Sequence, residues 1–450
     1  MDLIKKIDKL TAELIKKTIH PHTDGEVNTC KIIYQLADKE NWTETEIKQL
    51  DFLSKKIDIS KKLFLNYKKD GKKQSNEILK DKAWLELLLC ILIKSVLVEK
   101  QTTVKLKRFN VLFKALDIHT PSWKDILVCI EDEWQKLIQT MPIESPKATK
   151  VTHQNESSDK VTKIPLTVLF YEGPIARAYL ATLKNLGLKP QKIIELIAEN
   201  DLVSKKPVGK WMPKSLRKNY AANVQRSKIH YWSKHIARTN TALVNKVLSA
   251  VEIAYSISLE TSKDANKLLP LNNYCDNIDS IFIKNLNDST LMDYLTNEAK
   301  SALLYTGGGI VPAKLLSIQH LKFIHIHPGF LPDIRGADCT LWSSLITGHT
   351  SASCFYMSPG IDEGDIIFPC YLPQLSLKTD IEKLDLQLLY RLVYGYIDPW
   401  VRAYVLKQVL INHQEFENLD SITQNPKDGL TYHFMHQKVK QWTVHQMFQS

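Results

Sequence analysis

The stretch 164-IPLTVLFYEGPIARAYLATLKNLGLKPQKIIELIA-198 decides the fold. Ile164–Tyr171 is a continuous apolar run, as expected for a strand buried on both faces of a parallel sheet. Gly173–Leu186 then has the character of a helix, Gly187 ends that helix, and Lys192–Ala198 is a second apolar run. Strand, helix and strand within about 35 residues form a βαβ unit. We therefore predict an α/β fold with a doubly wound parallel sheet.

The same alternation continues downstream of this unit. The expected strands are Ser280–Phe282, Ser301–Tyr305, Phe323–Ile326 and Ser353–Met357, and the expected helices are Thr290–Ala299, Ala313–Ile318 and Leu386–Val409. Doubly wound sheets bind ligands at the carboxyl ends of their strands. The turn after the first strand reads Tyr-Glu-Gly-Pro rather than GxGxxG, so we do not expect a dinucleotide there.

Changes in composition predict the domain boundaries. Residues 1–140 contain helical apolar periods and predict an all-helical N-terminal domain. The polar segment 141–163 is the predicted linker. The α/β domain is expected at 164–410, and 411–450 is expected to be a short C-terminal extension.

Bulk composition limits the classes of function. The chain of 450 residues has 60 basic and 49 acidic side chains, and the formal charge of +11 fits either anionic partners or a lysine-rich solvated surface. Its seven cysteines form no CxxC pair, as in proteins of a reducing compartment. The N-terminus lacks the apolar core of a signal peptide, and the longest apolar run, Trp84–Val98, is interrupted by Glu86 and Lys94. We expect a cytoplasmic protein without a membrane span.

The stretch 323-FIHIHPGFLPDIRGADCTLWSSLITGHTSASCFYMSPGIDEGDIIF-368 contains the candidate catalytic residues. His325 and His327 are two positions apart on one strand, so their side chains point to the same side. The loop at Asp362 brings a carboxylate back to the same space. Two imidazoles facing a carboxylate suit acyl transfer to an amine, because protons must move and an oxyanion must be stabilised.

This stretch resembles the formyltransferases that use 10-formyltetrahydrofolate. Those enzymes carry a strand followed by Asn-x-His-Pro-x-Leu-Leu-Pro-x-x-Arg-Gly-Ala and, downstream, a Leu-Asp-x-Gly-Asp loop. The positions that match in register are His327, Pro328, Leu331, Pro332, Arg335, Gly336, Ala337, Asp362, Gly364 and Asp365. The resemblance covers roughly 164–410 and is dense over Tyr305–Ile367.

The resemblance implies a Rossmann-like one-carbon (formyl) transferase with 10-formyltetrahydrofolate as cosubstrate. The folate would lie against Gly308, Gly309, Ile310, Val311, Gly360 and Ile361. The acceptor amine would meet Pro328, Gly329, Arg335 and Gly336. His327 would be the general acid/base, with Asp362 supporting it. His325 stands where the family has asparagine, and it would bind the oxyanion.

Alternatives stay open at this point. The acceptor is a sugar nucleotide, an amino acid derivative or a carrier-bound amine. His325, His327 and Asp362 are also a plausible metal ligand set, which would make the protein a hydrolase, as would deformylation of folate. The histidines could instead be structural, in a non-catalytic protein that binds a ligand or RNA. Arg335 either braces its loop or contacts an anionic substrate.

The segment 204–246 suggests a further partner. It contains eleven Lys or Arg and no acidic residue, and its aromatic residues include Trp211, Tyr220, Tyr231 and Trp232. Cations with aromatic rings suit phosphate and base contacts. The part KKPVGKWMPKSLRK resembles the basic loop after the second strand in methionyl-tRNA formyltransferases. Nucleic acid is therefore a possible partner but not the favoured one, because too little chain follows the last predicted helix for the extra C-terminal domain of those enzymes.

Overall fold

The computed structural model describes residues 161–450, except 202, 382–383, 413–415, 417–418, 426–429, 433, 436 and 450, together with positions 9, 12 and 43. The predicted helical domain at 1–140 and most of the linker at 141–163 lie outside the described residues. The domain boundaries therefore stay predictions.

A seven-stranded mixed sheet forms the centre of the α/β region, and its strand order is β3-β2-β1-β4-β5-β7-β8. Its strands are β1 (Thr162–Tyr171), β2 (Leu188–Ala198), β3 (Ile278–Ile283), β4 (Ser301–Tyr305), β5 (Leu321–His327), β7 (Ser351–Tyr356) and β8 (Ile366–Tyr371). The first five are parallel, and β7 and β8 are antiparallel to their neighbours. The predicted α/β class is confirmed.

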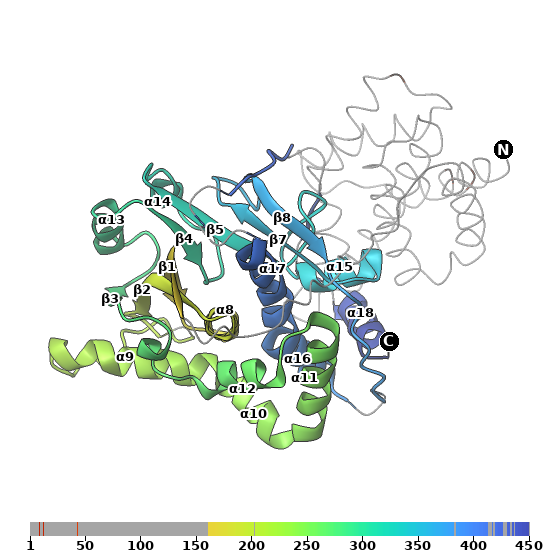
Figure 1. The fold of residues 1–450 in the computed structure, drawn as a ribbon. Helices are drawn as coiled ribbons and strands as arrows, with labels where there is room; N and C mark the ends of the chain where they lie inside the picture. The colour runs from red at the N-terminus through yellow and green to blue at the C-terminus, as the bar shows by residue number, and fades with distance from the viewer. Residues whose placement is uncertain are drawn as a thin grey trace. The chain divides into compact units, whose positions relative to one another are not determined.

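Helices cover both faces of this sheet (Figure 1). The helices described in this part of the sequence are α8 (Pro174–Asn185), α9 (Lys214–Ile229), α10 (Tyr231–Thr239), α11 (Thr241–Tyr255), α12 (Leu259–Lys267), α13 (Ser289–Thr296), α14 (Ala313–Leu316), α15 (Cys339–Thr347), α16 (Leu386–Leu392), α17 (Asp398–Asn412) and α18 (Gln437–Gln449), and only some of them pack directly on the sheet. Helices α13 and α14 lie on one face, and α8 and α17 lie on the other. The short strands β6 (Ile334–Gly336) and β9 (Leu430–Tyr432) form a separate sheet.

The α13–α14 face contains the core that positions the site. Leu169, Ile194, Leu303, Tyr305 and Phe323 are buried there against these two helices. Successive side chains on a strand alternate between the faces. The later odd-numbered residues of β5 therefore continue the same face beyond Phe323, and His325 and His327 are among them.

The structure contains several elements that the sequence analysis did not predict, and two of the differences lie near the predicted site or in the basic segment. The basic segment 204–246, for which we predicted no elements, is largely helical from Lys214 onward. The single helix predicted at Leu386–Val409 is α16 and α17 joined by a π-helical turn, η3 (Val393–Ile397). Tyr394, within this turn, donates a hydrogen bond to Asp338 Oδ1 over 2.7 Å, and a π-turn is an irregularity that periodicity does not reveal.

Candidate active site

His327 is held on both of its ring nitrogens. Its Nε2 donates a hydrogen bond to the Ile334 carbonyl over 2.9 Å, and its Nδ1 lies 3.3 Å from Asp362 Oδ2. The ring is only 3% exposed. A Cβ at Gly329 would lie 2.7 Å from Nε2, so the slot around the ring requires glycine. Burial lowers the pKa of His327, and the nearby Asp362 carboxylate opposes that shift.

The Asp362 loop is fixed by contacts from two distant segments. Asp362 Oδ2 accepts a hydrogen bond from the Gly336 backbone N–H over 3.0 Å. Gln424 donates from Nε2 to the backbone carbonyl of Asp362 over 2.9 Å and also to that of Gly364. The Asp362 backbone is left-handed, with φ of 57°. The loop thus presents its carboxylate to β5, as the sequence predicted.

His325 lies at the carboxyl end of β5 beside Tyr305 of β4. Its Nδ1 donates a hydrogen bond to the Tyr305 carbonyl over 3.1 Å, and its ring centroid lies 5.9 Å from that of Tyr305. The side chain is half-buried. Burial, with a further contribution from the Arg402 guanidinium, lowers the pKa of His325 to about 4. The imidazole is therefore neutral at pH 7.

The loop after β4 exposes its backbone and one apolar side chain. Tyr305 Oη donates to the Gly308 carbonyl over 3.0 Å, which anchors the loop. Gly309 has φ of +88°, and a Cβ at either Gly308 or Gly309 would meet nothing within 4 Å. Ile310 is 74% exposed, whereas Val311 is buried in the core. Three of the four predicted folate-contact residues in this loop are therefore accessible, and Val311 supports them from beneath.

The predicted folate residues of the second loop are also accessible. Gly360 and Ile361 are exposed, and the Ile361 side chain is 45% exposed. Two exposed isoleucines, Ile310 and Ile361, thus come from the two loops that the resemblance assigns to the folate.

The four predicted acceptor-binding residues lie mainly inside the protein. Pro328, Gly329 and Arg335 are buried, and Gly336 is half-buried. Arg335 NH1 lies 3.6 Å from Glu363 Oε1, which connects β6 with the Asp362 loop. This geometry favours the reading in which Arg335 braces the loop.

A cavity of about 450 Å³ opens at the carboxyl ends of β1 to β4. It is lined by Tyr171, Ala198, Asn200, Asp201, Lys205, Ile283, Lys284, Asn285, Leu286, Tyr305 and Gly308. Asp201 forms a salt bridge with Lys228, so its charge is compensated. Within the described part of the chain, Lys205 and Lys284 form no salt bridge, and both are exposed. Tyr305 connects the cavity with the site, because it is one of the residues that line the cavity and its carbonyl accepts the hydrogen bond from His325.

Several further residues hold these groups in place, although the sequence analysis did not identify them. Ser353 Oγ donates to the Gly329 carbonyl over 2.8 Å and accepts from the Leu331 N–H over 2.9 Å. Arg402 NH1 donates to the Ile326 carbonyl, between the two histidines, over 2.9 Å, and its Nε bonds Asp398 Oδ2 over 2.9 Å. The i,i+4 spacing of this Asp–Arg pair in an apolar predicted helix was the available signal.

A metal centre is not favoured by this arrangement. Among the described residues, no group of three His, Cys, Asp or Glu side chains is arranged to hold a metal ion. His325 Nδ1 and His327 Nε2 both face backbone carbonyls, which hold protons on these nitrogens.

The described helices include none that is long and apolar enough to cross a membrane.

The basic segment 204–246 neutralises several acidic side chains of the α/β region. Arg217 pairs with Glu199, Arg226 with Glu172, and Lys228 with Asp201. Part of its cationic character is thus structural. Its exposed aromatic residues are Trp211, Tyr220, Tyr231 and Trp232.

A short segment of the chain is similar in sequence to a known formyltransferase. No protein-family model matches the sequence. A segment of 62 residues, 13% of this chain, is 40% identical to the methionyl-tRNA formyltransferase of Syntrophus aciditrophicus (strain SB). The match spans 20% of that relative's length. The resemblance to folate-dependent formyltransferases is confirmed.

The solved structures that match the chain at low similarity include formyltransferases. A 4-N formyltransferase from Francisella tularensis is 14% identical, covering 61% of this chain and 76% of the other, with a TM-score of 0.31. PseJ of Anoxybacillus kamchatkensis, in complex with UDP-4,6-dideoxy-4-formamido-L-AltNAc and tetrahydrofolate, is 20% identical, covering 35% and 75%, with a TM-score of 0.23. Sequence identities and TM-scores this low carry no argument about activity, so the proposed function is based on the site.

Proposed function

We propose that the protein transfers a formyl group from 10-formyltetrahydrofolate to a primary amine. The observation that carries the proposal is the arrangement of His325, His327 and Asp362 at the carboxyl edge of the sheet, with the histidines on β5 and the carboxylate on the loop after β7. This is where doubly wound folds bind ligands. The three side chains supply the proton carriers and the charge that acyl transfer to an amine requires.

The two accessible loops fit the folate. Gly308 and Gly309 leave their backbone open to close approach, and Ile310 and Ile361 offer apolar surface. Gly360 and Val311 shape these loops. The aryl group of the folate is flat and largely apolar, and it suits the two isoleucines, whereas the open backbone at the glycines can approach the polar pterin closely.

The acceptor belongs in the neighbouring cavity. Lys205 and Lys284 face it with their charges uncompensated by a salt bridge, which favours an anionic group on the ligand. We therefore propose a phosphate-bearing amine, small or carrier-bound, as the acceptor. Pro328, Gly329, Arg335 and Gly336 form the turn behind the reacting group, and a nucleic acid is not part of this proposal.

Thermal unfolding with 5-formyltetrahydrofolate tests the folate site. A ligand at about 100 times its Kd adds roughly 2.7 kcal/mol to the stability of the native state, so we expect a clear rise in Tm. The control ligand is p-aminobenzoylglutamate, which carries the tail but no pteridine. Equal shifts with both ligands, or no shift at millimolar 5-formyltetrahydrofolate, would contradict the proposal.

A further inference from the structure

Hydrogen-bond partners fix the proton on each of the two imidazoles. A backbone carbonyl accepts hydrogen bonds and cannot donate them. The proton of His325 is therefore on Nδ1, which faces the Tyr305 carbonyl, and that of His327 is on Nε2, which faces the Ile334 carbonyl. The two rings thus carry opposite tautomers in their neutral forms.

His327 has no nitrogen left for a substrate. Its Nε2 is engaged with Ile334, and its Nδ1 faces Asp362. The Asp362 Oδ2 atom lies 3.3 Å from Nδ1, so the carboxylate occupies the side of the ring that Ile334 leaves open. The ring is almost fully buried, and Gly329 closes the slot around it. His327 and Asp362 therefore act as a fixed pair.

His325 has the opposite character. Its Nε2 forms no hydrogen bond with any of the described residues, and the side chain is half-buried rather than enclosed. It shares the sheet face of Tyr305, which is one of the residues that line the cavity, whereas His325 is not among the described lining residues. The Nε2 lone pair is thus an acceptor that no described residue occupies, one residue away from the proposed acceptor cavity.

The groups around His325 keep its Nε2 lone pair unprotonated near neutral pH. Burial and the Arg402 guanidinium of α17 both disfavour the imidazolium and lower the pKa, and His327 adds in the same direction. The Tyr305 carbonyl and the Asp362 carboxylate oppose them but do not prevail. A neutral imidazole with Nδ1–H is the resulting state.

We propose that His325, rather than His327, takes the proton from the attacking amine through Nε2; this inference rests on the proposed formyl transfer. As the amine nitrogen bonds to the formyl carbon, the carbonyl electron pair moves to oxygen and one N–H proton passes to Nε2. The imidazolium so formed can then donate to the oxyanion. The oxyanion pair then re-forms the C=O bond as the C–N bond to the folate breaks. The electron pair of that C–N bond stays on the folate nitrogen, which receives the proton from His325. The products are a formamide and tetrahydrofolate.

The asparagine of the related enzymes cannot perform this step, because an amide neither gains nor loses a proton near neutral pH. The substitution at position 325 thus changes an oxyanion donor into a proton carrier. His327 and Asp362 then hold the loop after β7 and the carboxylate of Asp362 in place.

Nitrogen NMR of the intact chain, with 15N-labelled histidine, tests the tautomer without any activity assay. His325→Asn assigns the His325 signals by their loss. We expect Nδ1–H with a bare Nε2 at pH 7, and protonation of Nε2 only near pH 4. An Nε2–H tautomer, or an imidazolium at pH 7, would overturn the proposal.

Chemical rescue tests the step itself, with hydroxylamine as the acceptor probe at pH 7. A general base contributes about 100-fold or more, so His325→Ala should lose at least that factor and regain about tenfold with added imidazole. His327→Ala is the matched control and should not be rescued, because its slot is closed. Rescue of His327→Ala alone, or an undiminished rate in His325→Ala, would overturn the assignment. An inactive wild-type chain with the expected tautomer would instead overturn the proposed formyl transfer, and this step with it.

Discussion

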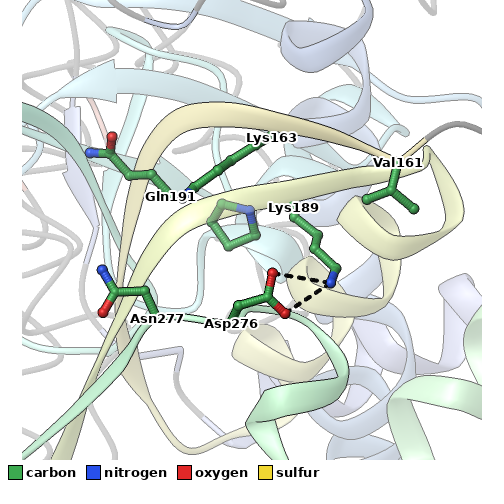
Figure 2. Close-up of a pocket in the computed structure, with 7 residues that line it drawn as sticks. Val161, Lys163, Lys189, Gln191, Asp276 and Asn277 are labelled. Carbon is green, nitrogen blue, oxygen red and sulfur yellow. Dashed lines mark hydrogen bonds and ion pairs between the residues drawn. The ribbon is translucent and has the colours of Figure 1, made fainter.

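The two edges of the central sheet use their charged residues in opposite ways. At the amino edge, a cavity of about 190 Å³ is lined by Val161, Lys163, Lys189, Pro190, Gln191, Asp276 and Asn277. Figure 2 shows Lys189 pointing at Asp276, with its Nζ 3.0 and 3.4 Å from the two carboxylate oxygens. At the carboxyl edge, Lys205 and Lys284 line a larger cavity without forming such a pair within the described chain.

The difference shows that a cavity by itself indicates little about function. Both cavities contain lysine, asparagine and a carboxylate. At the amino edge the lysine and the carboxylate satisfy each other. At the carboxyl edge the carboxylate of Asp201 is bound by Lys228 from α9, so other cations are left for a ligand. The carboxyl edge is also where the loops lead into the covering helices.

Glu172→Gln is expected to have the largest effect. Glu172 follows β1 at the carboxyl edge and binds Arg177, Arg226 and His230. Burial alone would raise the pKa of Glu172, but these partners outweigh it and lower the pKa to about 2. With an ordinary value of 4.5, that difference corresponds to ~3 kcal/mol of unfolding free energy at pH 7. Urea unfolding should show a loss of this size in the variant.

The sign of the pH dependence follows from the lowered pKa. The stabilisation by Glu172 is complete above pH 4.5 and is lost as the pH falls towards 2, so the unfolding free energies of the wild type and Glu172→Gln should become equal there.

The matched change at the amino edge is Asp276→Asn. Asp276 is 81% exposed, and its loss should cost below about 1 kcal/mol. Equal losses at the two edges would contradict the comparison.

Removing Lys205 and Lys284, which form no salt bridge with the described residues, should have an intermediate effect. The double variant Lys205→Ala, Lys284→Ala takes both ammonium groups from the large cavity. Calorimetric titration with uridine diphosphate should show binding about tenfold weaker, or ~1.4 kcal/mol. Lys189→Ala, at the amino edge, should leave the affinity unchanged. Loss of affinity with Lys189→Ala would mean that the ligand binds at the other edge.

Shortening one exposed isoleucine should have the smallest effect. Ile310→Ser removes apolar surface from the loop after β4, and binding of 5-formyltetrahydrofolate should weaken by ~1 kcal/mol. Stability should not change, because the side chain is 74% exposed. Val161→Ser is the control, since Val161 is 58% exposed at the amino edge. Similar changes in folate affinity for both variants would argue against a folate site at Ile310.

Sequence periodicity predicted the buried half of this fold better than its surface. The apolar runs of β1 and β4 were located closely, since a strand buried on both faces leaves a continuous apolar signature. Strand β8 was not predicted, because Pro369 lies within it and its residues are only partly buried. Helices α9 and α10 carry so many cations that their apolar face is short, and they were not predicted either.

Predicting the candidate site from the sequence had a different limit. The i,i+2 spacing of His325 and His327 correctly placed both residues on one face of β5. Spacing alone contains no information on which nitrogen of each ring is engaged. That depends on the Tyr305 and Ile334 carbonyls, which are set by strand register and by the turn after β5. The i,i+4 spacing of Asp398 and Arg402 indicated an ion pair, but Arg402 lies 76 positions after the Ile326 carbonyl, so that spacing did not indicate the contact with β5.

The hydrogen bonds from Gln424 to the Asp362 loop bear on protein engineering. The most recognisable segment of the chain ends near Ile367, yet the carbonyl of Asp362 is held by a side chain 62 positions later in the sequence. A graft of the motif alone into another scaffold would carry the carboxylate but not the contact that orients its loop. A transplant would need the segment around Gln424 as well, so the smallest transferable unit is set by hydrogen bonding rather than by sequence similarity.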